Sequence, residues 1–150
     1  MAEARDEAVP QWEPLPRDCP VYRAALNWNA IDKVSKEFVR GAFIRREPRE
    51  DGTPRDEHGI SVYVFREEGY SEEQIVELIR ADYDPCRGVG RLFVGPIRDI
   101  ETTPRLDVVQ DRKNHANIEG LPAHGKNIPK AERLATLLAK LTKRLWPDPA

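Results

Sequence analysis

Polar side chains with the chemistry of a catalytic or binding site gather between residues 114 and 119. Asn114, His115, Asn117 and Glu119 fall within this short segment. An imidazole titrates near neutral pH, so His115 can accept or deliver a proton beside a carboxylate. Because alternate residues of a strand share a face, a strand here sets His115, Asn117 and Glu119 in one row. Two interpretations stay open: a site for a polar substrate, or hydrogen bonds that tie the strand to the loop from Asp111.

A second polar cluster stands at the entrance of the strand that contains Ser61. Asp56, Glu57 and His58 can supply a carboxylate-oriented histidine or half of a metal site, or they can be solvated loop charges. A metal needs three or four converging ligands, and the sequence does not bring the three histidines of the chain together. We therefore expect no metal site. The candidate binding residues of both clusters are Asn114, Asn117 and His58.

Basic residues gather toward the C-terminus, beyond residues 114–119. Lys126, Lys130 and Arg133, with Arg144, can meet nucleic acid or an acidic partner, and Lys126 and Arg133 are further candidate binding residues. The alternative is the solvated face of an amphipathic helix. The segment lacks the interleaved aromatic residues of a platform that stacks single-stranded bases.

Composition excludes several classes of protein. The 150 residues carry a formal net charge of -2, whereas a protein that coats DNA is usually strongly basic. The chain contains only two cysteines, far apart, which fits a reducing cytoplasm better than a disulfide framework. No apolar run approaches the length of about 20 residues that spans a bilayer. We expect a cytoplasmic protein without membrane contact and without a cofactor.

The positions of prolines and apolar residues divide the chain into three parts. Residues 1–20 form an acidic, proline-rich arm that Trp12 and Leu15 can pin to the body. Residues 21–146 form a single domain, and residues 147–150 form a tail.

Apolar periodicity places the elements of the domain. We expect strands over 21–26, 42–46, 59–65, 88–97, 106–110 and 115–120. Helices are expected over 29–41, from Ser71 to about residue 84, and from Pro129 through Trp146. This order predicts an α+β fold: a mixed, mainly antiparallel sheet of about six strands with about three helices, the C-terminal amphipathic helix packing on the sheet.

A series of short motifs resembles small uncharacterised bacterial single-domain proteins with a similar strand order. The motifs are Ala42-Phe43, Gly59-Ile60-Ser61-Val62, Gly88-Val89-Gly90, Val94-Gly95-Pro96-Ile97-Arg98 and His115-Ala116-Asn117-Ile118-Glu119-Gly120. The resemblance covers most of residues 21–140. It implies a bacterial single-domain protein and no particular activity.

Three residues in order also resemble the ADP-ribosyltransferase folds, which bind and cleave NAD. Arg23 lies on the first strand, Ser61 on a later one and Glu119 on a further one, with Asn117 two residues before the glutamate. The resemblance implies that Arg23 holds a phosphate and that Glu119 stabilises the oxocarbenium-like centre as nicotinamide leaves. Ser61 lies in Ile60-Ser61-Val62 and lacks the Ser-Thr-Ser pattern of that family.

These observations lead to three hypotheses of function. The first is a non-catalytic cytoplasmic accessory or regulatory module that binds a protein partner, in a paired bacterial system. The second is a small enzyme acting on NAD, a nucleotide or nucleic acid, with His115, Glu119, Arg23 and Ser61 as its catalytic residues and NAD as the cofactor of the ADP-ribosyltransferase version. The third is a nucleic-acid-binding module that uses the basic C-terminal helix.

Overall fold

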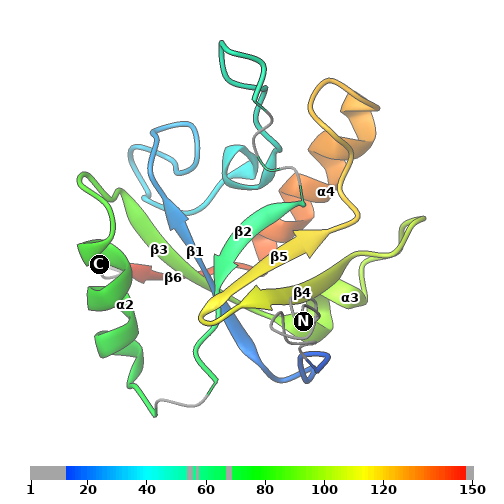
Figure 1. Ribbon diagram of the computed structural model, residues 1–150. Helices are drawn as coiled ribbons and strands as arrows, with labels where there is room; N and C mark the ends of the chain where they lie inside the picture. The colour runs from blue at the N-terminus through cyan, green and yellow to red at the C-terminus, as the bar shows by residue number, and fades with distance from the viewer. Residues whose placement is uncertain (1–12, 54–55, 57, 67–68, 148–150) are drawn as a thin grey trace, which may run out of the picture.

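Six strands form one sheet in the order β4-β5-β2-β1-β3-β6 (Figure 1). The structure is a computed structural model that describes residues 13–53, 56, 58–66 and 69–147. Every pair of neighbouring strands is antiparallel, which confirms the expected α+β class and its mainly antiparallel sheet. The strands are β1 Pro20–Ala25, β2 Ile60–Tyr63, β3 Gly88–Phe93, β4 Asp107–Arg112, β5 His115–Glu119 and β6 Lys143–Trp146.

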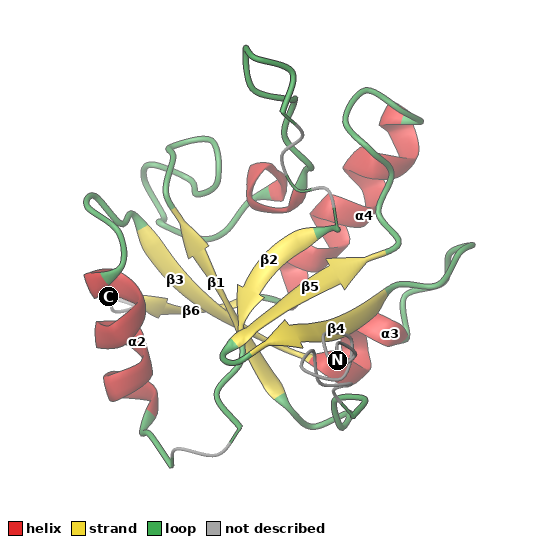
Figure 2. Ribbon diagram, viewed as in Figure 1, coloured by secondary structure: helices red, strands yellow, loops and turns green. Residues whose placement is uncertain are grey.

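Within the described ranges, three α-helices and one turn of 3-10 helix lie around the sheet (Figure 2). They are η1 Arg40–Phe43, α2 Glu72–Ala81, α3 Val94–Arg98 and α4 Ile128–Leu141. A capping box begins α2 at Ser71, where the predicted helix starts: Ser71 Oγ accepts from the backbone N–H of Gln74, and the Gln74 side chain accepts from the N–H of Ser71. This local signal made α2 predictable from the sequence.

The main core lies between one face of the sheet and helices α3 and α4. Val21, Ile60 and Leu92 project from the strands, and Leu134 and Leu138 of α4 are fully buried in the same cluster. Burial of each such leucine contributes roughly 1.5–3 kcal/mol before entropy is counted. The predicted packing of the C-terminal helix on the sheet is therefore confirmed.

A smaller core lies on the opposite face, under α2. Tyr22 and Val89 alternate with the residues of the main core along their strands, so they meet Ile75 and Ile79 of α2 instead. Helix α2 thus covers only the part of this face that belongs to β1 and β3. The part that belongs to β2, β5 and β4 carries polar side chains, among them Ser61, and it holds the site described below.

The helix predicted over 29–41 is wrong. Within this segment, the carboxylate of Asp32 accepts hydrogen bonds from the backbone N–H groups of Val34 and Ser35, and these bonds fold the chain into a turn. Lys36 has a positive φ of 65°, and Ile31 pairs with Phe38 in an isolated bridge. Side-chain to backbone hydrogen bonds therefore outcompete the helix. The strand predicted over 42–46 is also wrong, because η1 and a loop occupy that segment.

The C-terminal helix ends at Leu141 and does not continue through Trp146 as predicted. Thr142 adopts an extended backbone, and its hydroxyl donates to the Leu138 carbonyl, which closes the last turn. Lys143–Trp146 then forms β6, the edge strand beside β3. Leu145, counted in the predicted helical stripe, packs against the smaller core instead.

The described part of the N-terminal arm is attached to the body. Leu15 is 2% exposed and belongs to the main core, and Arg17 forms a bidentate ion pair with Asp99. Trp12 lies outside the described residues, as do residues 148–150 of the tail. Ordered structure therefore begins before residue 21, the expected start of the domain.

Candidate functional site

Strand register places the polar residues of β5 in one row on the open part of the sheet. Asn117 pairs with Ser61 of β2, and His115 pairs with Tyr63. Glu119 pairs with Asp107 of β4 at the far end of the row. The three side chains of β5 therefore share a face, as the alternation predicted.

One carboxylate, that of Asp111, binds both His115 and Asn117. Its oxygens lie 2.6 Å from His115 Nδ1 and 3.0 Å from Asn117 Nδ2. Asp111 reaches them because a β-bulge shifts the register between Gln110 and Arg112. Partial burial alone would raise the pKa of Asp111, but the hydrogen bonds of His115 and Asn117 outweigh it and hold that pKa below its usual value.

The contact of Asp111 with His115 is compatible with both interpretations of the segment, the structural one and the site for a polar substrate. Asp111 does tie β5 to β4 through His115 and Asn117, as the structural interpretation held. The same contact fixes His115 by Nδ1, so Nε2 is the nitrogen available to a ligand. A carboxylate that orients an imidazole in this way is a recurrent part of acid–base sites.

Two hollows meet at His115. The larger has a volume of about 920 Å³ and the smaller about 240 Å³. Ligand sites in proteins usually measure about 300–1,000 Å³. Both hollows are lined by the same four residues at their junction: Arg46, Ser61, Arg112 and His115.

Arg23 gives the larger hollow a fixed positive charge. Its Nε donates to the Ala42 carbonyl over 2.8 Å, and its Nη1 donates to the Ser61 carbonyl over 2.9 Å. Burial lowers the pKa of Arg23 to about 10, although the charge of Asp56 opposes this shift, so the side chain stays protonated at neutral pH. Within the described ranges, Arg23 forms hydrogen bonds but no ion pair.

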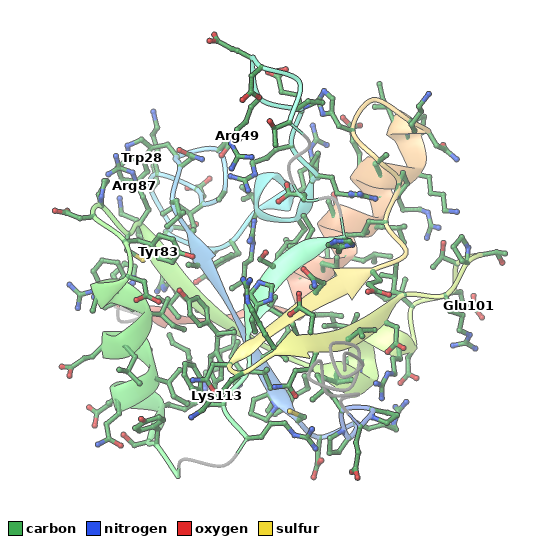
Figure 3. The ribbon with its side chains drawn as sticks, in the orientation of Figure 1. Trp28, Arg49, Tyr83, Arg87, Glu101 and Lys113 are labelled. Atoms are coloured by element: carbon green, nitrogen blue, oxygen red, sulfur yellow. The ribbon has the colours of Figure 1, made fainter. Side chains whose placement is uncertain are left out.

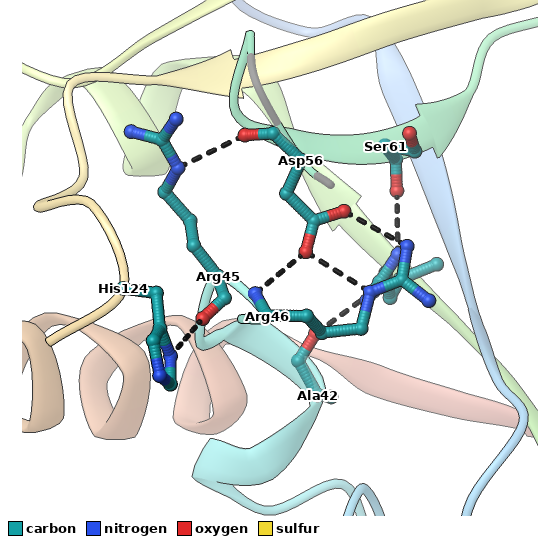
Figure 4. A network of polar contacts seen from close by, with 7 residues as sticks. Ala42, Arg45, Arg46, Asp56, Ser61 and His124 are labelled. Carbon is teal, nitrogen blue, oxygen red and sulfur yellow. Dashed lines mark hydrogen bonds and ion pairs between the residues drawn. The ribbon is translucent and has the colours of Figure 1, made fainter. Parts of the chain in front are cut away.

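A network of arginines borders the junction of the hollows (Figure 4). Asp56, with a side chain only 5% exposed, accepts from the Arg46 backbone N–H and from two nitrogens of the Arg46 guanidinium. Arg45 donates to the carbonyls of Asp56 and Leu121, and the imidazole of His124 contacts the Arg45 carbonyl. The network holds the loop between η1 and β2 against the sheet.

Aromatic rings form the wall of the larger hollow on the α2 side. Tyr63 and Phe65 stack with ring centroids 6.0 Å apart, and Tyr70 and Tyr83 meet them edge to face. Tyr70 is 41% exposed and Tyr83, labelled in Figure 3, is 36% exposed, so both present ring surface to the solvent. The Tyr63 hydroxyl donates to Asp82 over 2.6 Å, and burial together with this bond raises the pKa of Tyr63.

The structure brings some of the predicted site residues together and separates others. Arg23, Ser61 and Asn114 line the larger hollow with His115, whereas Asn117 and His58 line the smaller. Glu119 lines neither hollow. Its pKa is raised, by burial and by the neighbouring Asp107. The three residues of the ADP-ribosyltransferase resemblance therefore do not share one hollow.

The predicted basic candidates of the C-terminus lie away from both hollows. Lys126 and Arg133 are exposed before and on α4, which packs on the opposite face of the sheet. The Lys130 ammonium group donates to the Thr103 carbonyl. Arg144, grouped with them in the sequence, is 7% exposed and pairs with Glu37, so it does not extend a basic helix surface.

Sequence reasoning missed several residues of the site. Asp111 was named only as the start of a loop, and Arg112 and Tyr83 received no role. A signal for Asp111 exists in the short Lys113-Asn114 connection between β4 and β5, where Asn114 has a φ of 63° that suits a tight hairpin. Such a hairpin brings residue 111 beside residue 115.

Three further results bear on the kind of protein this is. Among the described residues, no group of three histidines, cysteines or carboxylates is placed to hold a metal ion. None of the described helices has the length and apolar character needed to cross a bilayer. Comparison with known proteins finds no matching family model, no similar curated protein and no similar solved structure. Both family resemblances therefore stay hypotheses.

Proposed function

We propose that the joined hollows bind a nucleotide unit and that His115 transfers a proton on it. The observation that carries this proposal is that Arg23, which has no ion pair in the described structure, lines the same hollow as a histidine oriented by a carboxylate. We rank this version of the enzyme hypothesis above the protein-partner hypothesis because Arg23 and His115 line one hollow, which sequence patterns did not indicate.

The cations of the site suit the phosphate of such a ligand. Arg23 keeps its charge in surroundings that disfavour it, and a bound anion would relieve that cost. Arg112 lines both hollows and has no hydrogen bond or ion pair from its guanidinium within the described ranges. Charge-assisted bonds from arginine to phosphate are among the strongest hydrogen bonds in proteins.

The aromatic wall suits the base of the ligand. Tyr70 and Tyr83 expose ring surface along the larger hollow, and stacking on an aromatic side chain is worth about 1–3 kcal/mol per base. Stacking is tolerant of base identity, so this wall by itself selects a nucleotide rather than one particular base.

His115 is the group that can act on the bound ligand. Asp111 holds Nδ1, which leaves Nε2 as the nitrogen that can meet a ligand, and His115 lines both hollows. A histidine so oriented typically contributes 10²–10⁴-fold to a reaction rate by proton transfer.

Calorimetric titration with uridine 3′-monophosphate, adenosine 3′-monophosphate and inorganic phosphate tests the binding. We expect both nucleotides to bind more tightly than phosphate alone, because only they use the aromatic wall. Arg112→Ala should weaken nucleotide binding by at least roughly tenfold, since a hydrogen bond to a charged group is worth about 1.5–3 kcal/mol and each 1.4 kcal/mol is a factor of about ten. The matched control is Arg133→Ala, which removes an exposed arginine from α4. Equal losses in the two variants, or no binding by wild type, contradict the proposal.

NAD is the additional probe in the same titration. The larger hollow holds two of the three residues of the ADP-ribosyltransferase resemblance but not Glu119. We therefore expect NAD to bind through its phosphates and adenine without release of nicotinamide. Release that is lost in Glu119→Gln would instead support the ADP-ribosyltransferase hypothesis.

A specific surface favours the protein-partner hypothesis as a second candidate. Val34 is 92% exposed, and Trp28 is 41% exposed between Lys36 and Arg87, whose charges lie 5.0 and 4.2 Å from its ring (Figure 3). Tryptophan and arginine are enriched among the residues that dominate protein interfaces. A native complex in size-exclusion chromatography that Trp28→Ala dissociates, and Arg133→Ala leaves intact, would support this role. A monomer in native extract counts against it.

A further inference from the structure

The two hollows differ in chemistry on either side of His115. The larger has the aromatic wall of Tyr63, Phe65, Tyr70 and Tyr83. The smaller is lined by polar and charged side chains with one glycine. Its three arginines, among them Arg49, outnumber its two aspartates, Asp56 and Asp111, which are bound to Arg46 and His115. A ligand that fills both therefore carries a planar group on one side of the imidazole and a polar, anionic group on the other.

We infer that this ligand is single-stranded RNA, which crosses the junction so that one phosphodiester lies at His115. This inference rests on the proposed function and names its substrate. The base and ribose before the phosphodiester occupy the larger hollow, and the following sugar-phosphate occupies the smaller. The chain has a net charge of -2, so recognition depends on the local arginines and not on a basic surface.

RNA suits the groups of this site because the nucleophile, the ribose 2′ hydroxyl, is part of the substrate. The ribose 2′ hydroxyl lies next to the phosphorus atom of the same nucleotide, so the protein needs only a base to take its proton and cations to stabilise the charge on phosphorus. His115 supplies the base. Arg112 and Arg46, at the junction itself, supply the cations, since arginine pairs with phosphoryl oxygens in two-point contacts.

The reaction is an internal phosphoryl transfer. Nε2 of His115 takes the proton of the 2′ hydroxyl, and the 2′ oxygen forms a bond to phosphorus. The bond from phosphorus to the 5′ oxygen of the next nucleotide breaks, and that oxygen keeps the electron pair. The leaving oxygen takes a proton from water, and the hydroxide formed takes the proton from the imidazolium. The products are a 2′,3′-cyclic phosphate end and a 5′ hydroxyl end.

Asp111 lines the smaller hollow, and in this scheme it is a positioning residue because it acts on the reaction through the imidazole of His115. Its negative charge stabilises the imidazolium formed when His115 accepts the proton. Asp111→Asn should therefore lower the cleavage rate and shift its pH profile while leaving RNA affinity within threefold. A purely structural role for Asp111 would change affinity and thermal midpoint without moving the pH profile.

The test uses the full chain and a labelled single-stranded RNA pool of random sequence, with a DNA pool of the same length. Wild type should cleave RNA to ends that mass spectrometry identifies as 2′,3′-cyclic phosphates. His115→Gln should lose 10²–10⁴-fold in rate and keep its affinity for RNA. Arg133→Ala should match wild type. DNA should bind within tenfold of RNA and stay intact, because it lacks the 2′ hydroxyl.

The outcomes separate this inference from the proposed function. RNA that binds in the hollows but is not cleaved, ends that carry a 3′ hydroxyl, or cleavage of DNA would overturn the inference and leave nucleotide binding standing. Failure of both RNA and mononucleotides to bind overturns the proposed function as well. If His115→Gln does not fold, His115→Asn and Arg112→Ala replace it. Full cleavage by a folded variant of His115 also overturns the inference.

Discussion

At the scale of single residues, the site depends on carboxylates that are shared between strands and loops. Asp111 orients His115, and Asp56 holds Arg46 in place beside the same hollows. The side chain of Asp56 is 5% exposed, so this carboxylate needs its partners to stay ionised at little cost, whereas that of Asp111 is 39% exposed. The geometry of the proposed phosphate contacts therefore depends on residues that need not touch the ligand themselves.

The Asp56 contact predicts a measurable dependence of stability on pH. Burial raises the pKa of Asp56, but the hydrogen bonds and charge of Arg46 outweigh burial and leave the pKa below its usual value. A carboxyl whose pKa is lower when folded stabilises the fold above its unfolded pKa of about 3.9, and loses this effect as pH falls through the folded value. Urea unfolding of wild type should show that loss below about pH 4.

Asp56→Asn isolates this effect. Asparagine tolerates the positive φ of 55° at this position, so the change removes mainly charge. We expect a loss of about 1–2 kcal/mol at pH 7, because Asp56 is buried but Arg46 is half exposed. The gap should narrow below pH 4. Exposed Asp18→Asn is the control and should change stability by less than about 0.5 kcal/mol. A constant gap from pH 7 to pH 2 would contradict the assignment.

At the scale of elements, β3 shows why two glycines of one strand have different roles. A Cβ atom at Gly90 would lie 2.3 Å from Thr142 Cγ2 and 2.9 Å from Phe38 Cε1. Thr142 cannot rotate away without losing its bond to the Leu138 carbonyl. At Gly88, the nearest atom would lie 3.4 Å away, which is ordinary contact. Close packing of β3 therefore requires glycine at position 90 and not at position 88.

Alanine substitution at each glycine tests this difference. Gly90→Ala should destabilise the fold by about 1–3 kcal/mol, the usual cost of overpacking a core. Gly88→Ala should stay within about 1 kcal/mol of wild type, because alanine suits a strand better than glycine does. Thermal and urea unfolding measure both. Equal losses at the two positions would show that the packing of Phe38 and Thr142 is looser than described.

Elements were predictable where one local signal acts alone, and not where a competing side-chain hydrogen bond or a distant partner strand decides the structure. The capping box of Ser71 and Gln74 lies within α2, and β5 follows from its own alternation. The helix expected around Val34 failed because the carboxylate of Asp32 binds the backbone N–H groups. The C-terminal helix was predicted too long because Leu145 fits helical spacing but pairs as part of β6. Periodicity carries no information about such a partner strand.

At the scale of the whole molecule, the sheet is buried by α3 and α4 on one face and only partly by α2 on the other. The site lies on the face that α2 covers only in part, and only one component of it could be predicted from the sequence. The row of His115 and Asn117 follows from one strand. The hollows need the loop around Arg46, the hairpin at Asp111 and the aromatic residues near α2 to meet, and sequence patterns do not record such long-range contacts.

The burial of α4 predicts which leucines carry the stability of the molecule. Leu138 is fully buried, whereas Leu141 is 38% exposed on the same helix. Leu138→Ala should cost about 2–5 kcal/mol in the free energy of unfolding, because it leaves a cavity in the main core. Leu141→Ala should cost about 1 kcal/mol or less. Urea unfolding distinguishes them, and similar losses would mean that α4 is not packed as the structure shows.

The most direct test of the whole account is an NMR titration of the labelled protein with uridine 3′-monophosphate. We predict shifts in the imidazole of His115, the rings of Tyr70 and Tyr83, and the guanidinium of Arg112, with none on α4 beyond background. In the Arg112→Ala variant the same signals should move only at roughly tenfold higher ligand concentration. Shifts confined to α4 or to the surface around Trp28, or no shifts at millimolar nucleotide, would contradict the claim that the hollows at His115 are the functional site.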